Sequence, residues 1–401
     1  MSGTTEQSGS TPIRSFRVEF PEEALEDLRG RIAAARWPSK ELVEDRSQGA
    51  QLEAVRALAD YWVNDYDWRR CEAKLNALPQ FKTEIDGTDV HFIHVKSRHG
   101  EALPLIMTHG WPGSVVEMLD TVGPLTDPTE HGGRAEDAFD LVLPSVPGYG
   151  FSAEPTEVGW DLFRTARAWA ELMRRLGYAR YVAQGGDVGA GVTDAMSRQA
   201  PEGLIGVHTN LLVPALNDPA ALPADAEKEK AALAAIKAFQ TSGNGYFVEQ
   251  STRPQTIGYA LLDSPVALAA WMVDHDTDAY YKIAAAFTDD KASGNLTRDH
   301  ILDNVTTYWL TGTGASAARS YWEAYGPDAP AASQKPLPAS TIPFGFTTFP
   351  GEIWRTPRSW VEASYPNVVY FNEVDKGGHF AAWEEPELFS SEMRAAFKSL
   401  R

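Results

Sequence analysis

The sequence is poor in cysteine: Cys71 is the only one among 401 residues, so the chain cannot form an internal disulfide bond. The flanking Arg69, Arg70 and Glu72 do not form a metal-binding pattern. The sequence also lacks a secretory signal and any apolar run of the length that a membrane span needs. These absences predict a protein of the reducing cytoplasm that uses neither a metal ion nor another cofactor.

Basic residues are also scarce, with 36 Lys and Arg against 55 Asp and Glu, which gives a net charge of −19 and a pI near 4.9. This charge repels the phosphates of nucleic acids and anionic lipid surfaces, so we expect neither as a partner. The share of hydrophobic residues, 43%, is that of an ordinary globular protein. The length suits one large α/β domain with an insertion.

Two helical patterns precede the first strand signals. Residues 1–14 are rich in Ser, Thr and Gly and are predicted to form a mobile tail. Apolar residues then recur at helical spacing over 21–37 and again over about 51–66. We therefore expect residues 1–80 to form a helical N-terminal extension.

The following segment alternates strands and helices, which is typical of a mostly parallel sheet with helices on both faces. Asp86-Gly87 separates two alternating runs and predicts a hairpin. Residues 215–335 contain Ala-rich helical stretches (223–239, 256–276, 298–325) without a clear strand, so we expect a helical lid that divides the core into 81–214 and 336–401. The predicted further strands are 104–110, 139–148, 179–186, 204–212, 342–349 and 367–374, with a closing helix over about 386–400.

The sharpest local signal is Gly185-Gly186-Asp187-Val188-Gly189, between a predicted strand and a helical run. It has the form glycine, any residue, nucleophile, any residue, glycine. A strand that turns abruptly into a helix strains the central residue and needs small neighbours, and Asp at the centre makes the nucleophile a carboxylate. The pentapeptide alone fits equally well a glycine-rich turn in which Asp187 caps the following helix.

A second motif, HGWPGS at 109–114, directly follows a predicted strand. This is the place where such a fold supplies the first backbone donor to an oxyanion. We therefore predict that the N–H groups of Trp111 and Val188 form an oxyanion hole. By itself the motif also fits a tight turn with Trp111 in the core.

A histidine and an acid follow in the required chain order of nucleophile, acid, histidine. His379 lies in GGHF beyond the last predicted strand, and Glu352 lies in FPGE after the strand predicted at 342–349. Glu352 is predicted to accept the Nδ1–H of His379 and fix its tautomer. A structural histidine and a surface carboxylate are the plain alternatives, and Asp375 and Glu373 lie nearer to His379 in the sequence.

Together these motifs resemble the microsomal-type epoxide hydrolases over nearly the whole chain, from about Ile13 to the end. The resemblance implies an α/β-hydrolase fold. The sequence departs from the family at Val188, where Trp is frequent, and in lacking an N-terminal apolar anchor. The motifs are YWVNDYDWRRCEAKLNALPQF (61–81), HGWPGS (109–114), PSVPGYGFS (144–152), QGGDVG (184–189), GYFVEQSTRPQTIGYALLDSPVALAAW (245–271), YWLTGT (308–313), FPGE (349–352) and GGHFAAWEEPE (377–387).

The resemblance implies hydrolysis of an epoxide to a vicinal diol through an ester on Asp187, with water activated by His379. It assigns the two lid tyrosines of the family to Tyr246 and Tyr321, although Tyr308 and Tyr325 lie on the same helical stretch as the latter. The chain is most similar to soluble bacterial members, including those of enediyne antibiotic pathways, which leaves antibiotic biosynthesis and detoxification both open. The residues expected at the substrate are Trp111 and Tyr149.

Lid aromatics indicate a bulky apolar or aromatic epoxide, with water as co-substrate, and a homodimer stays open. A haloalkane-dehalogenase-like hydrolase is the nearest alternative, but Val188 cannot supply the indole donor that a departing halide needs. A ligand-binding homologue that lost its chemistry is the alternative from another class. The lid aromatics are Phe239, Trp271, Trp309 and Trp322.

Overall fold

A mixed, mostly parallel sheet forms the centre of the molecule. The structure is a computed structural model, and it describes residues 12–327 and 338–401. Within this part of the chain nine strands pair in the order β1-β2-β3-β5-β4-β6-β7-β8-β9, antiparallel from β1 to β5 and parallel from there on. The strands are β1 (Arg14–Phe16), β2 (Gln80–Ile85), β3 (Thr88–Val95), β4 (Leu103–Thr108), β5 (Phe139–Pro144), β6 (Tyr181–Gly185), β7 (Leu204–Thr209), β8 (Phe344–Thr348) and β9 (Val368–Glu373).

The predicted hairpin is confirmed between β2 and β3. Asp86 and Gly87 have φ angles of 49° and 78°, and Ile85 pairs with Thr88 across the turn. Two successive residues with positive φ define the type I′ turn, whose twist matches that of the flanking strands. Asp-Gly is a favoured pair for this turn, because Gly carries no Cβ and Asp tolerates the left-handed region.

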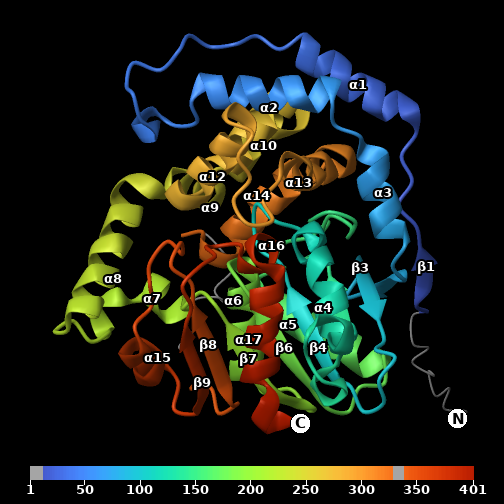
Figure 1. Cartoon of the computed structure of the whole chain (residues 1–401), viewed down its shortest axis with the longest axis vertical. Helices are drawn as coiled ribbons and strands as arrows, with labels where there is room; N and C mark the ends of the chain where they lie inside the picture. Colours follow the sequence, from blue (N-terminus) through green and yellow to red (C-terminus); the bar gives the residue numbers. More distant parts are fainter. Residues whose placement is uncertain (1–11, 328–337) are drawn as a thin grey trace, which may run out of the picture.

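Helices cover both faces of the parallel strands, as the alternating pattern predicts. In Figure 1, α4 (Val122–Thr126) and α17 (Pro386–Ala396) lie in front of the sheet, whereas α5 (Leu162–Arg175) and α6 (Val188–Gln199) lie behind it. Strands β4 and β6 are consequently buried on both faces and carry near-continuous apolar runs. The carboxyl ends of these strands point toward the helical layer above them.

That upper layer is helical, but its long helices are divided (Figure 1). The stretch predicted over 256–276 is two helices, because Pro265 lacks an N–H and disfavours a helical residue before it. The stretch predicted over 298–325 is interrupted at Gly312, which ends a helix with φ of 65°. The helices of the insertion are α7 (Val213–Asn217) and α8 (Glu227–Ala238), which lie to the left of the sheet in Figure 1, and α9 (Gly245–Thr252), α10 (Pro254–Asp263), α11 (Pro265–Val273), α12 (Thr277–Thr288), α13 (Arg298–Thr311) and α14 (Gly314–Tyr325).

The N-terminal segment is helical except at its start. Helices α1 (Glu22–Ala33) and α2 (Leu52–Asn64) pack on the lid helices α11 and α12, and α3 (Trp68–Asn76) packs on α13. Arg14, expected in the mobile tail, instead begins β1, which pairs with the edge of β2. The sequence did not predict β1 because a strand of three residues is too short to show the alternation of apolar and polar residues. The rest of the expected tail, 1–11, lies outside the described residues.

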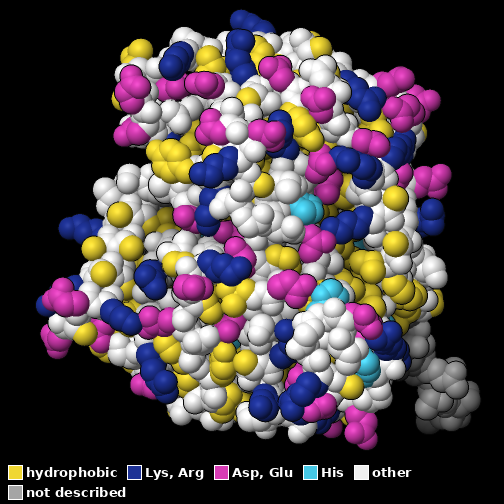
Figure 2. Space-filling model, viewed as in Figure 1, with side chains coloured by type: hydrophobic (Ala, Val, Ile, Leu, Met, Phe, Trp, Pro, Cys, Tyr) yellow, Lys and Arg dark blue, Asp and Glu magenta, His cyan; other side chains and the backbone are white. Residues whose placement is uncertain are grey.

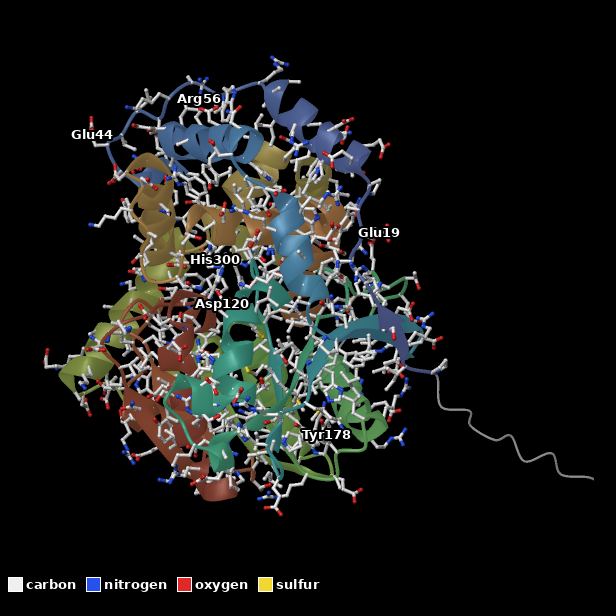
Figure 3. All side chains as sticks on the ribbon, turned by 45° about the vertical axis from the view of Figure 1, so that its right-hand side comes forward. Glu19, Glu44, Arg56, Asp120, Tyr178 and His300 are labelled. Atoms are coloured by element: carbon white, nitrogen blue, oxygen red, sulfur yellow. The ribbon has the colours of Figure 1, made fainter. Side chains whose placement is uncertain are left out.

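Asp120 joins three parts of the chain at one point. It lies in the short helix η2 (Val115–Thr121) of the core and accepts hydrogen bonds from Lys74 Nζ at 2.5 Å and from Asn295 Nδ2 at 2.6 Å. His300 Nε2 of α13 lies 3.3 Å from the same carboxylate, and Figure 3 shows the two side chains close together. The contacts tie the N-terminal helices and the lid to the core.

The surface mixes charges of both signs. On the face drawn in Figure 2, Lys and Arg side chains are interspersed with Asp and Glu over most of the elements. Among the helices of the described ranges, none combines the length and apolar character that a bilayer crossing requires.

Candidate active site

Asp187 lies at a strained turn between β6 and α6. Its backbone has φ of 50° and ψ of −124°, and its side chain does not cap the helix that follows. A Cβ on Gly185 would lie 2.0 Å from the carbonyl oxygen of Gly189, and one on Gly189 would lie 2.0 Å from that of Thr108. The glycines are therefore required sterically, and the interpretation of Asp187 as an ordinary N-cap is wrong.

Two backbone amides reach the Asp187 carboxylate. The N–H of Trp111 donates to Oδ1 at 2.8 Å, and the N–H of Val188, at the start of α6, helps to lower the pKa of this carboxylate. A Cβ on Gly110 would lie 2.4 Å from Cβ of Asp187, so only glycine lets the loop approach this closely. The Trp111 amide is therefore held against Oδ1 of Asp187.

His109 holds the loop in this position. Its Nε2 accepts the N–H of Val146 at 3.1 Å, and its Nδ1 lies 3.0 Å from the carbonyl oxygen of Gly110. Burial lowers the pKa of His109 to about 4, so the imidazole is neutral and its Nδ1–H donates to Gly110. The HGWPGS motif therefore contains a structural histidine two residues before the Trp111 amide.

His379 and Glu352 meet because their loops are joined. The N–H of Gly351 donates to the carbonyl oxygen of Gly377 at 3.0 Å, and Gly351 and Gly378 form a parallel bridge. His379 Nδ1 lies 2.5 Å from Glu352 Oε1, and its Nε2 lies 3.2 Å from Asp187 Oδ2. The acid that contacts His379 is thus Glu352.

The other acids near His379 in the sequence point elsewhere. Asp375 is exposed, and Glu373 forms an ion pair with Lys228 at 2.8 Å. His379 itself is only 3% exposed. The structure therefore brings together Asp187, Glu352 and His379 and leaves both alternative acids outside.

Opposite charges set the ionisation of this group. Burial alone lowers the pKa of His379, but the charge of Glu352 and the hydrogen bonds to Asp187 and Glu352 outweigh it and place the pKa well above its ordinary value. Burial raises the pKa of Asp187, and the imidazole with the amides of Trp111 and Val188 more than offsets this, so the pKa of Asp187 is lowered. The resting state is consequently an imidazolium between two carboxylates.

Two lid tyrosines converge on Trp111. The ring of Tyr246 on α9 stacks on that of Trp111 with centroids 4.9 Å apart, and the ring of Tyr321 on α14 meets it edge-on at 5.9 Å. Burial, reinforced by the charge of Asp187, raises the pKa of both phenols well above the ordinary value, so both are protonated. Within 12–327 and 338–401, neither hydroxyl is hydrogen-bonded to another residue.

The neighbouring tyrosines differ. The hydroxyl of Tyr308 donates to the carbonyl oxygen of Gly113 at 2.6 Å, so it is not free to serve a ligand. Tyr325 lies 5.9 Å from Tyr321 between ring centroids and is influenced by the charge of Asp187, so it stays an alternative acid. Tyr149 is fully buried, and its hydroxyl lies 2.6 Å from Oγ of Ser320, which ties this loop to α14.

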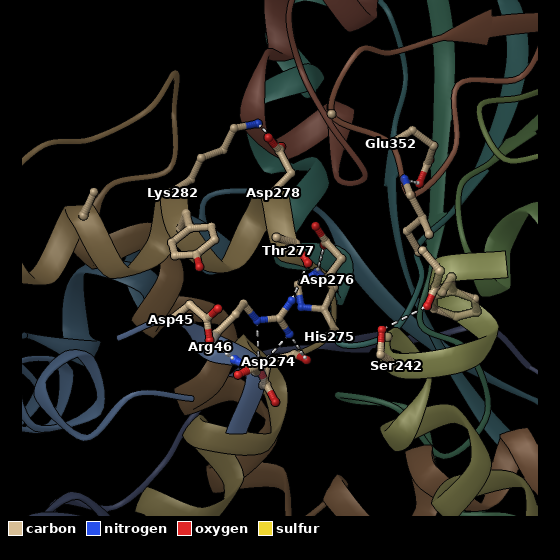
Figure 4. Close-up of a pocket in the computed structure, with 18 of the residues that line it drawn as sticks. Asp45, Arg46, Ser242, Asp274, His275, Asp276, Thr277, Asp278, Lys282 and Glu352 are labelled. Atoms are coloured by element: carbon tan, nitrogen blue, oxygen red, sulfur yellow. Dashed lines mark hydrogen bonds and ion pairs between the residues drawn. The ribbon is translucent and has the colours of Figure 1, made fainter. Parts of the chain in front are cut away.

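A buried contact between His275 and Asp276 beside His379 had no clear signal in the sequence. His275 Nε2 lies 2.6 Å from Asp276 Oδ2, and the rings of His275 and His379 are 6.0 Å apart. The pair borders a cavity of about 1040 Å³ that also reaches Glu352; Figure 4 shows it beside Arg46. The polar HDTD run within an apolar lid is the only trace that the sequence offers.

This geometry defines a class. An aspartate at a strained strand-to-helix turn, a backbone amide on its carboxylate, and an acid and histidine on later loops of a mostly parallel sheet are the arrangement of an α/β-hydrolase. The sequence comparisons then give the family.

Residues 13–118 match the family model described as "Epoxide hydrolase N terminus". A protein of Stigmatella aurantiaca (strain DW4/3-1) that bears an epoxide hydrolase name is 49% identical over 97% of this chain and 86% of its own length. "Epoxide hydrolase 1" of Sus scrofa is 35% identical over 95% of this chain and 88% of its length. The structure of Aspergillus niger epoxide hydrolase superposes with a TM-score of 0.82 at 32% identity, covering 98% of each chain. The chain belongs to the microsomal-type epoxide hydrolase family.

Membership gives the reaction, which is the hydrolysis of an epoxide by water. It also confirms the α/β-hydrolase fold that the resemblance implies. Family membership does not assign roles to individual side chains. We propose these roles from the geometry of the site.

Proposed function

We propose that this enzyme opens its epoxide through a covalent ester on Asp187, in two half-reactions. The observation that carries the proposal is the half-buried carboxylate at the strained turn, held by Trp111 and His379 beneath the lid tyrosines. In the first half-reaction Oδ2 attacks an epoxide carbon, a carbon–oxygen bond forms, and the ring carbon–oxygen bond breaks. Oδ1 stays hydrogen-bonded to the Trp111 amide.

Tyr246 and Tyr321 act as the acids of this first step. Ring opening leaves an alkoxide, which is too basic to depart without a proton. One phenol gives that proton while the other donates a hydrogen bond, and their raised pKa values keep both protonated until the alkoxide forms. The imidazolium of His379 then restores the phenol proton through solvent.

The second half-reaction depends on the loss of the negative charge of Asp187 in the first. An ester on Asp187 is neutral, so one of the two anions that raise the pKa of His379 disappears and the imidazole becomes a usable base. Neutral His379 takes a proton from water, whose oxygen attacks Cγ of Asp187. The oxyanion on Oδ1 is held by the Trp111 and Val188 amides, and collapse expels the diol oxygen, which takes the proton back.

The walls of the site support a bulky apolar or aromatic epoxide. Trp111, Tyr246 and Phe247 surround Tyr321, and the rings of Phe247 and Tyr321 lie 5.4 Å apart. Trp111 and Tyr149 form part of the proposed substrate wall, Tyr149 through its ring. A role in bacterial antibiotic biosynthesis belongs to this proposal on the strength of the sequence resemblance to enediyne-pathway members. The proposal also includes a homodimer, which a measurement of the molecular mass in solution tests.

The tyrosines provide the first test. Tyr246→Phe and Tyr321→Phe should each slow ester formation by about tenfold to a hundredfold, and the double variant by about a thousandfold or more, because general-acid help is worth about 10² to 10⁴. Rapid-quench measurement of a single turnover checks this. Tyr280→Phe, whose hydroxyl accepts the N–H of Gln51 far from Asp187, is the control. Normal ester formation in the double variant would contradict the assignment and point to Tyr325.

The orienting acid gives a second test. Glu352→Gln keeps the shape but removes the charge that favours the correct tautomer and the imidazolium, so ester hydrolysis should slow by about a hundredfold or more. Ester formation should slow less. The exposed Asp375→Asn is the matched control and should change neither rate by more than about twofold. The reverse order, measured by following ester decay, would show that the acid is misassigned.

A further inference from the structure

A second, very small cavity reaches Asp187 and His379 from within the core. Its volume is about 20 Å³, which exceeds the roughly 10–15 Å³ that one water molecule needs. The residues lining it come from the core and not from the lid. They are Gly110, Glu117, Met118, Gln184, Gly186, Asp187, Asn210, His379, Phe380, Ala381, Ala382 and Phe389.

The polar groups around this cavity suit one water. His379 and Asp187 border it, and the amide of Asn210 lies against Gly186, where a Cβ would come within 2.9 Å of Asn210 Oδ1. Asn210 is itself oriented, because its Oδ1 accepts Gln184 Nε2 at 3.3 Å. A buried water needs two to four polar partners, and the cavity offers that number.

Glu117 is an acidic side chain of this lining that the two half-reactions do not use. It is only 7% exposed, and within the described ranges its Oε2 has no hydrogen-bond partner. That oxygen occupies the space beside Gly113, where a Cβ would lie 1.6 Å away, so the HGWPGS loop leaves room for it. A buried carboxyl with an unpaired oxygen is costly and calls for an explanation.

We propose that Glu117 binds the hydrolytic water in this cavity, between His379 and the ester carbon of Asp187. The inference rests on the proposed two-step mechanism and deepens it. The water would give one proton to His379 Nε2 and form the new bond to Cγ, while Glu117 keeps its own proton throughout. Glu117 is thus a water-binding residue of the second half-reaction alone.

The ionisation of Glu117 agrees with this role. Burial raises its pKa well above the ordinary value, the charge of Asp187 adds to this, and His379 and the Gly110 N–H oppose it only in part. The acid is therefore neutral and has both a donor and an acceptor for a water molecule. A charged carboxylate there would instead repel Asp187.

A purely structural role predicts something different. Glu117 Oε2 lies beside Gly113, where a Cβ would be 1.6 Å away, so Glu117 also touches the loop that carries the Trp111 amide. If positioning this loop were its function, loss of Glu117 would slow ester formation and ester hydrolysis together. A water-binding role slows hydrolysis alone.

The test measures both rates in two variants of the whole protein. Glu117→Gln keeps a donor and an acceptor in the same shape, so both steps should stay within about threefold of the unmodified enzyme. Glu117→Met has a similar volume without polar atoms, so ester decay should slow by about tenfold to a hundredfold while ester formation stays within about threefold. Rapid quench followed by intact-protein mass spectrometry resolves the two steps. Met173→Leu, at a buried position on α5 that does not line this cavity, is the control and should leave both rates unchanged.

Three outcomes would overturn the inference: unchanged ester decay in Glu117→Met, equal slowing of both steps, or slow decay in Glu117→Gln as well. Circular dichroism verifies the fold, and Glu117→Ala replaces the Met variant if the latter does not fold, with the same split expected. If no ester forms in the unmodified enzyme or in His379→Gln, the proposed mechanism fails and not the water site alone.

Discussion

Asp187→Asn is expected to lower kcat by about 10⁴-fold or more, because an amide oxygen is a poor nucleophile and single knockouts of a covalent catalytic group cost this much or more. The fold should persist, since Asn tolerates a positive φ and keeps an oxygen for the Trp111 amide. Diol formation measured by chromatography gives the rate. An inactive but folded variant also excludes a mere ligand-binding protein, provided that the unmodified enzyme turns over.

Asp194→Asn is the matched control on the same helix. Asp194 is buried, accepts the Tyr365 hydroxyl at 2.5 Å and pairs with Arg198 at 2.7 Å, so its loss should cost about 1–3 kcal/mol of unfolding free energy. Its kcat should stay within about threefold. If Asp187→Asn retained turnover within tenfold and Asp194→Asn lost it, the nucleophile would lie elsewhere.

The position of Asp187 at a strand-to-helix turn could be predicted from the sequence because the turn imposes local steric limits. A strand-to-helix turn needs glycine at positions where a Cβ would strike backbone, and the distances of 2.0 Å at Gly185 and Gly189 show that the pattern records this constraint. The hairpin at Asp86-Gly87 was predictable for the same kind of reason. The divisions at Pro265 and Gly312 also have local signals, which the broad helical periodicity masked.

Tertiary contacts decide what the sequence leaves open. The choice of Glu352 over Asp375 depends on the bridge between Gly351 and Gly378, which no local pattern announces. Glu117 lies in an irregular helix whose sequence, VVEMLD, looks like an ordinary amphipathic segment. Only the folded chain places its carboxyl in a cavity with His379.

The charge state of His379 is a further property that cannot be predicted from the sequence. It depends on two carboxylates at 2.5 and 3.2 Å, and these distances come from loops far apart in the chain. In the proposed mechanism this arrangement lets one imidazole stay protonated at rest and act as a base once an ester has formed on Asp187. Removing the imidazole should therefore separate the two half-reactions.

His379→Gln is expected to stop turnover after the first half-reaction. The variant keeps Asp187 and both lid tyrosines but has no base for water, so ester hydrolysis should slow by about a thousandfold or more. Ester formation should slow less, and the ester should accumulate to about one per protein. The double variant His379→Gln, Asp187→Asn should accumulate none.

Mass spectrometry of His379→Gln incubated with an aryl epoxide is the most direct measurement of the central claim. The account predicts a gain of one epoxide mass on the intact protein and an adduct in the tryptic peptide YVAQGGDVGAGVTDAMSR, residues 181–198. Fragmentation of that peptide should place the adduct on Asp187 and not on Asp194. An adduct on another residue, or ring opening that continues with no adduct at all, would contradict the covalent role of Asp187.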